Sequence, residues 1–264
     1  MSKFKRGLVP TPRHRLAAAL WAGSLLKKMP VPPTNRAFTH KVHDWCMCGN
    51  DTYGDCVVAE ESNYKKLIST ATNASEVEIS SQETVNWYFA ATGGQDTGMD
   101  IETAIVRMAT VPLVDVNNRQ HFDGKPGAID FTNQTEVMRA IQYFKGIKIG
   151  IAADQLENTQ AGYSNGWVLT GATQDTNYDH CVGLYGYGDA SYLAFACGLT
   201  STPQPLTPHE FCVLMYTWGT IGIVNWKSLQ NICGEAWVRI TDPDRGDAVT
   251  WTPVAEQEYG LITG

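Results

Sequence analysis

Residues 49–56 read Gly-Asn-Asp-Thr-Tyr-Gly-Asp-Cys, and a run of helical character from Val57 to Leu67 follows at once. Cys56 would therefore open a helix, where aligned backbone N–H groups and the positive end of the helix dipole favour thiolate over thiol. Far along the chain, His180 begins a segment with strand character. A remote imidazole can complete an ion pair with such a thiolate and later return the proton. Together the two residues predict thiol nucleophile chemistry, without indicating a substrate.

Composition describes an ordinary globular protein. The 264 residues are 43% hydrophobic and 18% charged, enough for one large domain or two small ones. The seven cysteines form no regular disulfide framework, which favours a reducing, cytoplasmic setting. The apolar stretch from Leu16 to Leu26 lies between basic residues and predicts a short amphipathic helix rather than a signal peptide. No stretch has the length of a bilayer-spanning segment, so no membrane association is expected.

Charge is unevenly distributed along the chain. Before Asp44 there are nine basic residues and no acidic ones, whereas the rest holds 11 basic against 27 acidic residues. Residues 1–43 are also rich in proline, which favours extended backbone. We expect an extended N-terminal arm at 1–43 and one domain at 44–264. The arm could fold back over the acidic domain of its own chain, or bind another subunit or an acidic partner. Nucleic acid is not expected, because no aromatic or glycine–basic pattern accompanies the charge.

Periodicity predicts helices in the first half of the domain and strands in the second. Ser80, Asp100 and Asn133 have the spacing of helix caps, and Asp55 is expected to cap the helix that Cys56 begins. The expected helices cover about 56–70, 81–93, 101–111 and 134–146, and a short one begins near Trp226. The expected strands cover 147–153, 167–170, 180–187, 211–217 and 235–240, with a strand or two in 114–131. Helices followed by an antiparallel sheet indicate an α+β fold.

These motifs resemble the papain-like cysteine peptidases. The likeness consists of a cysteine opening the first long helix, a histidine 124 residues later, and the sequences Tyr-Gly-Tyr-Gly at 185–188 and Tyr-Thr-Trp-Gly at 216–219. More narrowly, the chain is similar to a branch found in bacterial, prophage and phage sequences. The segments that match this branch are Val9–His14, Gly49–Cys56, Asp179–Val182 and Glu235–Trp237. That branch implies no particular activity.

The papain-like resemblance implies roles for three residues. Cys56 matches the nucleophile and His180 the general base and acid. Asn50 stands where the wider family keeps a glutamine that helps to bind the oxyanion, and the Cys56 N–H would be the second donor. The third triad member departs from the family, since Tyr216 stands where an asparagine is expected. We therefore expect Tyr216 or a backbone carbonyl to orient His180.

A second group of residues has the chemistry of metal ligands. His40, His43, Cys46 and Cys48 suit zinc by type, but their spacing fits no standard finger, and no second pair lies nearby. We expect a loop leading to the Cys56 segment, and neither a metal nor a cofactor.

Two functions remain open. The first is a papain-like cysteine hydrolase that cleaves a peptide, isopeptide or related amide bond, with a peptide or a peptidoglycan-like cross-link as substrate. The second is a weakly active or inactive papain-like structural protein. It could be virion-associated, using the arm for contacts with other copies or with phage structural proteins.

Overall fold

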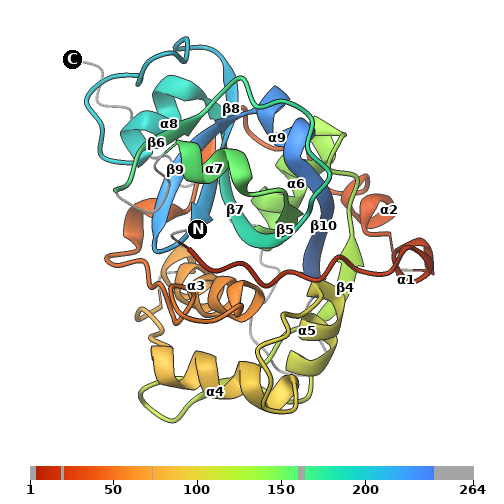
Figure 1. The fold of residues 1–264 in the computed structure, drawn as a ribbon. Helices are drawn as coiled ribbons and strands as arrows, with labels where there is room; N and C mark the ends of the chain where they lie inside the picture. The colour runs from red at the N-terminus through yellow and green to blue at the C-terminus, as the bar shows by residue number, and fades with distance from the viewer. Residues whose placement is uncertain (1–3, 19–20, 73, 160–163, 241–264) are drawn as a thin grey trace.

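The computed structural model describes residues 4–18, 21–72, 74–159 and 164–240, and it has the predicted α+β architecture (Figure 1). Three helices form one side of the molecule: α3 (Cys56–Ala71), α4 (Ser81–Ala91) and α5 (Ile101–Met108). The sheet and the helices α6 (Gln134–Phe144), α8 (Ala190–Ala196) and α9 (Trp226–Ile232) form the other. Within the described residues, no helix combines the length and the apolar character needed to cross a bilayer.

Side-chain caps fix where four of these helices begin. Ser80, Asp100, Asn133 and Asn225 each accept a hydrogen bond from the backbone N–H three residues further on. Such a bond satisfies one of the free donors at a helix start. The first three caps were predicted at these positions, and they are confirmed. At the other end of α6, Lys145 adopts the left-handed conformation with φ 67° and ends the helix one residue before Gly146.

The main sheet has the strand order β4-β10-β5-β7-β8-β9-β6, and β1 also pairs with β7. All of its pairs are antiparallel except β6 with β9. Its strands are β1 (Arg36–Ala37), β4 (Lys125–Ala128), β5 (Ile147–Ile151), β6 (Trp167–Leu169), β7 (His180–Asp189), β8 (Phe211–Thr217), β9 (Thr220–Asn225) and β10 (Cys233–Ile240). The strand β7 is central: β5 pairs with its first half and β1 with Gly186 and Tyr187.

Several elements differ from the sequence predictions or were missed. The stretch expected to form one helix over 16–26 instead contains α1 (Arg13–Ala18) and α2 (Gly23–Leu26). A 3₁₀ turn, η1 (Thr39–Lys41), follows β1. The small pair β2 (Leu113–Val114) and β3 (Gln120–His121) overlaps the region 114–131, where a strand or two were expected. The helices α7 (Asp154–Asn158) and α8 and the strand β9 were not predicted.

A buried group of charges joins α3 to the sheet. Glu60 and Glu61 of α3 are fully buried and face Lys148 of β5 and Arg239 of β10. The Lys148 Nζ lies 2.7 Å from Glu61 Oε2, and Arg239 Nη2 lies 2.7 Å from the same oxygen. Arg239 also stacks on the Tyr64 ring at 3.8 Å. Burial by itself would raise the pKa of Glu61, but Arg239 and Lys148 outweigh it and hold that pKa well below its ordinary value.

The first described residues, 4–9, run along the boundary between the helical side and the sheet (dark red in Figure 1). They make backbone hydrogen bonds to both sides. Lys5 N–H donates to the Asn50 carbonyl in the segment before α3, and Leu8 N–H donates to the Asp179 carbonyl just before β7. This segment, residues 4–9, therefore passes between the start of α3 and the start of β7, where Cys56 and His180 lie.

Candidate active site

Cys56 is the first residue of α3 and is buried, with 1% of its surface exposed. The backbone N–H groups of Cys181 and Gly7 both donate toward its sulfur, the first at 3.4 Å. Burial raises the pKa of the thiol to about 12, and the two donors offset only part of that effect. In this conformation Cys56 is therefore a neutral thiol at physiological pH.

His180 begins β7, one peptide bond before the Cys181 N–H that reaches the Cys56 sulfur. The fold thus brings together two residues that are 124 positions apart in the sequence. The imidazole is buried, and it stacks on the Trp218 indole with ring centres 4.4 Å apart. Burial, with a smaller contribution from the nearby positive charge of Arg6, lowers the pKa of His180 to about 3. The ring is therefore neutral at physiological pH.

Thr217, not Tyr216, orients this imidazole. The Thr217 Oγ1 lies 2.7 Å from His180 Nε2. The prediction that Tyr216 would take this part is wrong, because the Tyr216 hydroxyl donates to the Cys46 carbonyl at 2.6 Å. Successive side chains of a strand point to opposite faces, so only one of these two neighbours can face His180. With Nε2 engaged, Nδ1 has no hydrogen-bond partner among the described residues and is the nitrogen free to accept a proton.

Asn50 is buried in the turn before α3. Its Nδ2 donates to the Tyr53 carbonyl at 3.1 Å, and its amide lies against the carboxyl group of Asp55. The side chain of Asp55 does not cap α3, contrary to the prediction; the Asp55 carbonyl accepts the first helical bond, from Ala59 N–H at 2.9 Å. Burial raises the pKa of Asp55 to about 8, an effect that the Asn50 amide partly offsets. The Asn50 amide therefore supports the turn in this conformation, and its part in oxyanion binding stays a prediction.

The segment of residues 4–9 covers the Cys56 thiol, and Gly7 makes this close approach possible. A Cβ atom at Gly7 would lie 1.7 Å from the Gly54 carbonyl oxygen, closer than any real contact. On its other side the Gly7 carbonyl accepts a hydrogen bond from Met99 N–H at 2.8 Å. Access to the sulfur therefore requires this segment to move.

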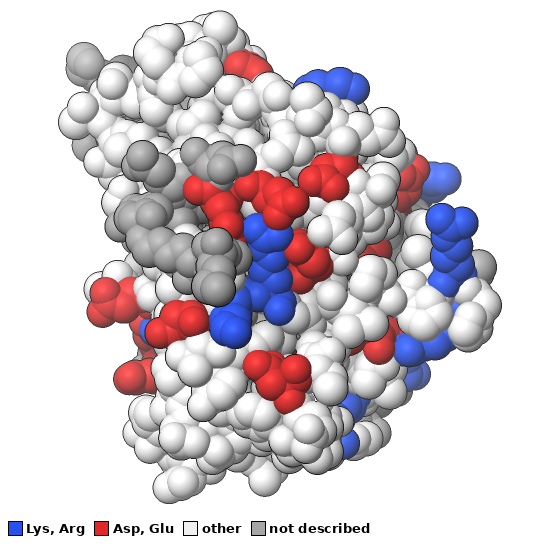
Figure 2. Space-filling model, in the orientation of Figure 1, with Lys and Arg blue, Asp and Glu red and all other residues white. Residues whose placement is uncertain are grey.

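Aromatic stacking and ion pairs hold the same segment in place. The Phe4 ring stacks on the Trp218 ring, with ring centres 4.4 Å apart. The Arg6 guanidinium forms ion pairs with Asp154, with Glu157 at 3.0 Å and with Asp179 at 2.8 Å. In Figure 2 basic side chains in the middle of this face are flanked by acidic ones. Burial would lower the pKa of Arg6, but these carboxylates outweigh it and raise that pKa.

A hollow of about 470 Å³ remains beside the segment. It is bordered by Lys5, Arg6, Gly7, Leu8, Gly54, Asp96, Thr97, Gly98 and Asp179. The hollow therefore lies along the same boundary as the covered thiol.

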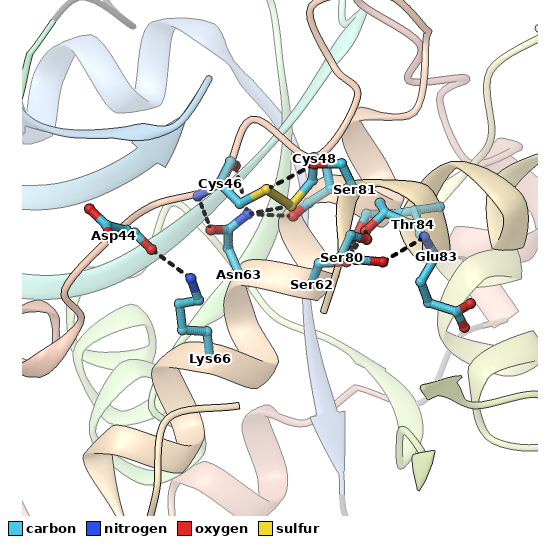
Figure 3. The surroundings of a disulfide bond; sticks show 12 residues. Asp44, Cys46, Cys48, Ser62, Asn63, Lys66, Ser80, Ser81, Glu83 and Thr84 are labelled. Atoms are coloured by element: carbon cyan, nitrogen blue, oxygen red, sulfur yellow. Dashed lines mark hydrogen bonds between the residues drawn. A yellow bond between two sulfur atoms is a disulfide. The ribbon is translucent and has the colours of Figure 1, made fainter. Parts of the chain in front are cut away.

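The loop before the site contains a disulfide between Cys46 and Cys48 (Figure 3). The sequence indicated only reduced cysteines, so the Cys46–Cys48 disulfide corrects that prediction. The loop is tied to α3 by Asn63, whose Oδ1 accepts from Cys46 N–H at 2.9 Å and whose Nδ2 donates to the Cys46 carbonyl at 3.0 Å. The two sulfurs bond to each other, and in the described part of the chain no group of acidic, histidine or cysteine side chains could hold a metal ion.

Sequence reasoning singled out Cys56 and His180, which the fold brings close together, but it missed three neighbours of the imidazole and thiol. Thr217 was in a recognised segment, and strand alternation could have selected it. Trp218 lies in the same segment, and its ring stacks on His180. Gly7 carried no signal, because its role depends on where residues 4–9 lie in three dimensions.

No protein-family model and no curated protein sequence matches the chain. Solved structures do match it. Xylellain, a cysteine protease from Xylella fastidiosa, is 11% identical, with 91% of this chain and 97% of that chain covered and a TM-score of 0.59. The ragweed pollen cysteine protease Amb a 11 in its proform is 12% identical, with 92% and 77% covered and a TM-score of 0.62. Procathepsin L2 from the larval midgut of Tenebrio molitor is 14% identical, with 89% and 74% covered and a TM-score of 0.58. The chain therefore has the α+β fold of the papain-like cysteine proteases.

Proposed function

We propose that the protein is a papain-like cysteine hydrolase whose site is closed by residues 4–9. The observation that carries this proposal is the meeting of Cys56, at the start of α3, with the start of β7, where His180 is held by Thr217 at 2.7 Å. A chain that needed only the fold would not require a cysteine, a histidine and an orienting hydroxyl in one buried place.

The reaction follows from these groups. His180 Nδ1 takes the proton of the Cys56 thiol, and the sulfur attacks the carbonyl carbon of an amide bond. The oxyanion accepts hydrogen bonds from the Cys56 N–H and, after rotation, from the Asn50 amide. The intermediate collapses, the C–N bond breaks, and the leaving amine takes the proton from His180. Water, deprotonated by His180, then cleaves the thioester and restores the thiol.

The closed conformation explains why the two groups are neutral here. The pKa of Cys56 is raised to about 12 and that of His180 is lowered to about 3, in both cases mainly by burial. When residues 4–9 leave, water reaches both groups and the effect of burial weakens, so the two pKa values move toward each other. A thiolate–imidazolium pair then becomes accessible. Several structural neighbours are proforms, which is compatible with a covered site.

The substrate class is an amide bond in a peptide, an isopeptide or a peptidoglycan-like cross-link. We base this on the papain-like fold alone.

A non-catalytic function is the second candidate, and the same pKa values favour it. If residues 4–9 never leave, Cys56 and His180 stay neutral and the protein is a structural or assembly component, virion-associated in a phage setting. Its partners would then be other copies or neighbouring virion proteins, bound through the basic N-terminal region.

The two functions can be separated with full-length variants. Gly7→Ala should displace the segment, because a Cβ at Gly7 cannot fit against the Gly54 carbonyl. We expect Gly7→Ala to hydrolyse members of a peptide and muropeptide library, and Gly7→Ala with Cys56→Ala to hydrolyse none while it unfolds at the same temperature. Equal product from both variants, or no product from either, would contradict the hydrolase and favour the structural function.

A further inference from the structure

The three carboxylates around Arg6 are not used in the chemistry proposed above. We propose that Asp154, Glu157 and Asp179, the acidic subsite, bind an arginine or lysine side chain of a peptide substrate once residues 4–9 have left. The inference rests on the proposed hydrolase function and adds a substrate preference to it. Its basis is that the protein already holds one cationic side chain of an extended peptide there.

The acidic subsite lies next to the reacting groups, although the Asp154 side chain is 61% exposed. Asp179 immediately precedes His180, and its two oxygens have separate partners: Oδ1 accepts from Ala153 N–H at 3.2 Å and Oδ2 from Arg6 at 2.8 Å. Glu157 reaches the other guanidinium nitrogen at 3.0 Å. Its side chain is 21% exposed and that of Asp179 is 27% exposed, so water screens these charges only in part.

The Arg6 guanidinium occupies the acidic subsite, and it belongs to residues 4–9, which lie across Cys56 as a bound peptide would. Its Gly7 lies over the Cys56 sulfur, and Arg6 is the adjacent residue. The next residue, Leu8, donates its N–H to the Asp179 carbonyl at 3.1 Å. A peptide backbone that passes Cys56 therefore projects a neighbouring side chain into the three carboxylates. The Arg6 side chain is only 15% exposed, which shows that this position encloses the cation.

Without Arg6, the three carboxylates of the acidic subsite carry uncompensated negative charge, which favours binding of another cation. Asp154, Glu157 and Asp179 face one guanidinium, and departure of the segment leaves them with none of its positive charge. A planar guanidinium can bond two carboxylates at once, so arginine should bind better than lysine.

Binding can be tested apart from catalysis in the full-length chain carrying Arg6→Ala, Gly7→Ala and Cys56→Ala. These substitutions empty the acidic subsite, displace the segment and prevent turnover. The probes are two blocked hexapeptides, Phe-Ala-Arg-Gly-Leu-Val and the same peptide with citrulline, a neutral isostere, in place of arginine. We expect the arginine peptide to bind at least about fivefold more tightly by calorimetry.

Further substitutions in the same background assign the preference to the acidic subsite. Asp154→Asn with Glu157→Gln should reduce the ratio of the two affinities to below about twofold, because two of the three carboxylates then carry no charge. Glu78→Gln is the matched control, since Glu78 is an exposed carboxylate outside the acidic subsite. It should leave the ratio unchanged.

Equal affinity for the two peptides, no measurable binding of either, or a preference that survives Asp154→Asn with Glu157→Gln would each overturn the inference. Far-UV circular dichroism and the unfolding temperature establish that each variant is folded. Restoring Cys56 in the same background tests hydrolysis separately from binding of the cation. If the arginine preference holds but no Cys56-dependent hydrolysis occurs, the hydrolase proposal fails while the cation site stands.

Discussion

Burial sets the protonation state of each key side chain at the candidate site. Cys56, His180 and Asp55 are all buried, and each is shifted toward its neutral form, because a charged group loses hydration in the interior. For Cys56 and His180, we expect this neutrality to be lost when residues 4–9 leave the site. Replacing one of these residues should therefore change how the free energy of unfolding depends on pH.

Asp55→Asn should stabilise the protein increasingly as pH rises from 4 to 8. The folded protein keeps a proton on Asp55 up to its pKa of about 8, whereas the unfolded chain releases it near its ordinary value. Between these values rising pH favours unfolding, by on the order of 1 kcal/mol per pH unit. Asparagine imitates the protonated acid and removes that term. Urea unfolding of both proteins at several pH values measures the difference, and a difference that does not change with pH would contradict a buried, protonated Asp55.

Thr217→Val should weaken both folding and catalysis. Valine has the shape of threonine but leaves His180 Nε2 without its partner at 2.7 Å. Loss of a buried hydrogen bond costs about 1–3 kcal/mol. In the Gly7→Ala background we also expect kcat/KM to fall about ten- to a hundredfold, because the imidazole is no longer oriented. Thr217→Ser keeps the hydroxyl and should restore most of the activity; if serine is as impaired as valine, the hydroxyl is not the orienting group.

At the scale of elements, the candidate site depends on how α3 meets β5, β7 and β10. The buried charges Glu60, Glu61, Lys148 and Arg239 lie at that junction. Removing one member of a buried ion pair is costly, because it leaves the opposite charge uncompensated. The junction should therefore be sensitive to single substitutions that change its charge.

Arg239→Met should lower the free energy of unfolding by about 3–5 kcal/mol, because it removes one of the buried cations that compensate Glu60 and Glu61. Lys227→Met, at an exposed lysine of α9, is the matched control and should change it by less than about 0.5 kcal/mol. Urea denaturation measures both. A loss below about 1 kcal/mol for Arg239→Met would mean that the charges are hydrated and do not hold α3 to the sheet.

The sequence predicted those elements whose signals are local. Ser80, Asp100 and Asn133 cap their helices as expected, because a cap needs only a side chain three residues from its partner. The strand starting at His180 was also predicted. The expectation that Tyr216 or a backbone carbonyl would orient His180 was wrong, because the side chain that reaches the imidazole depends on which face of the sheet each residue of β8 occupies. The position of Gly7 depends on contacts between distant segments, and the Cys46–Cys48 pair depends on loop geometry. Sequence periodicity reports neither.

At the scale of the whole molecule, residues 4–9 join the helical side to the sheet across the candidate site (Figure 1). The Phe4 stack on Trp218, the close fit of Gly7 and the ion pairs of Arg6 all act on this one segment. In the proposed hydrolase, this segment keeps Cys56 and His180 buried and therefore neutral. Opening of the segment is therefore the event that should create a reactive thiolate.

The rate of Cys56 alkylation by iodoacetamide between about pH 5 and 9 tests this account most directly. It is followed by peptide mass mapping in the wild type, in Gly7→Ala, and in Gly7→Ala with His180→Ala. Faster tryptic cleavage after Arg6 establishes that the segment has been displaced. We predict slow labelling in the wild type throughout, fast labelling of Gly7→Ala at about pH 5–6, and loss of that fast reaction without His180. Labelling of Gly7→Ala that rises only near the ordinary thiol pKa of about 8.5 would contradict the account, because the exposed thiol and imidazole would then form no ion pair.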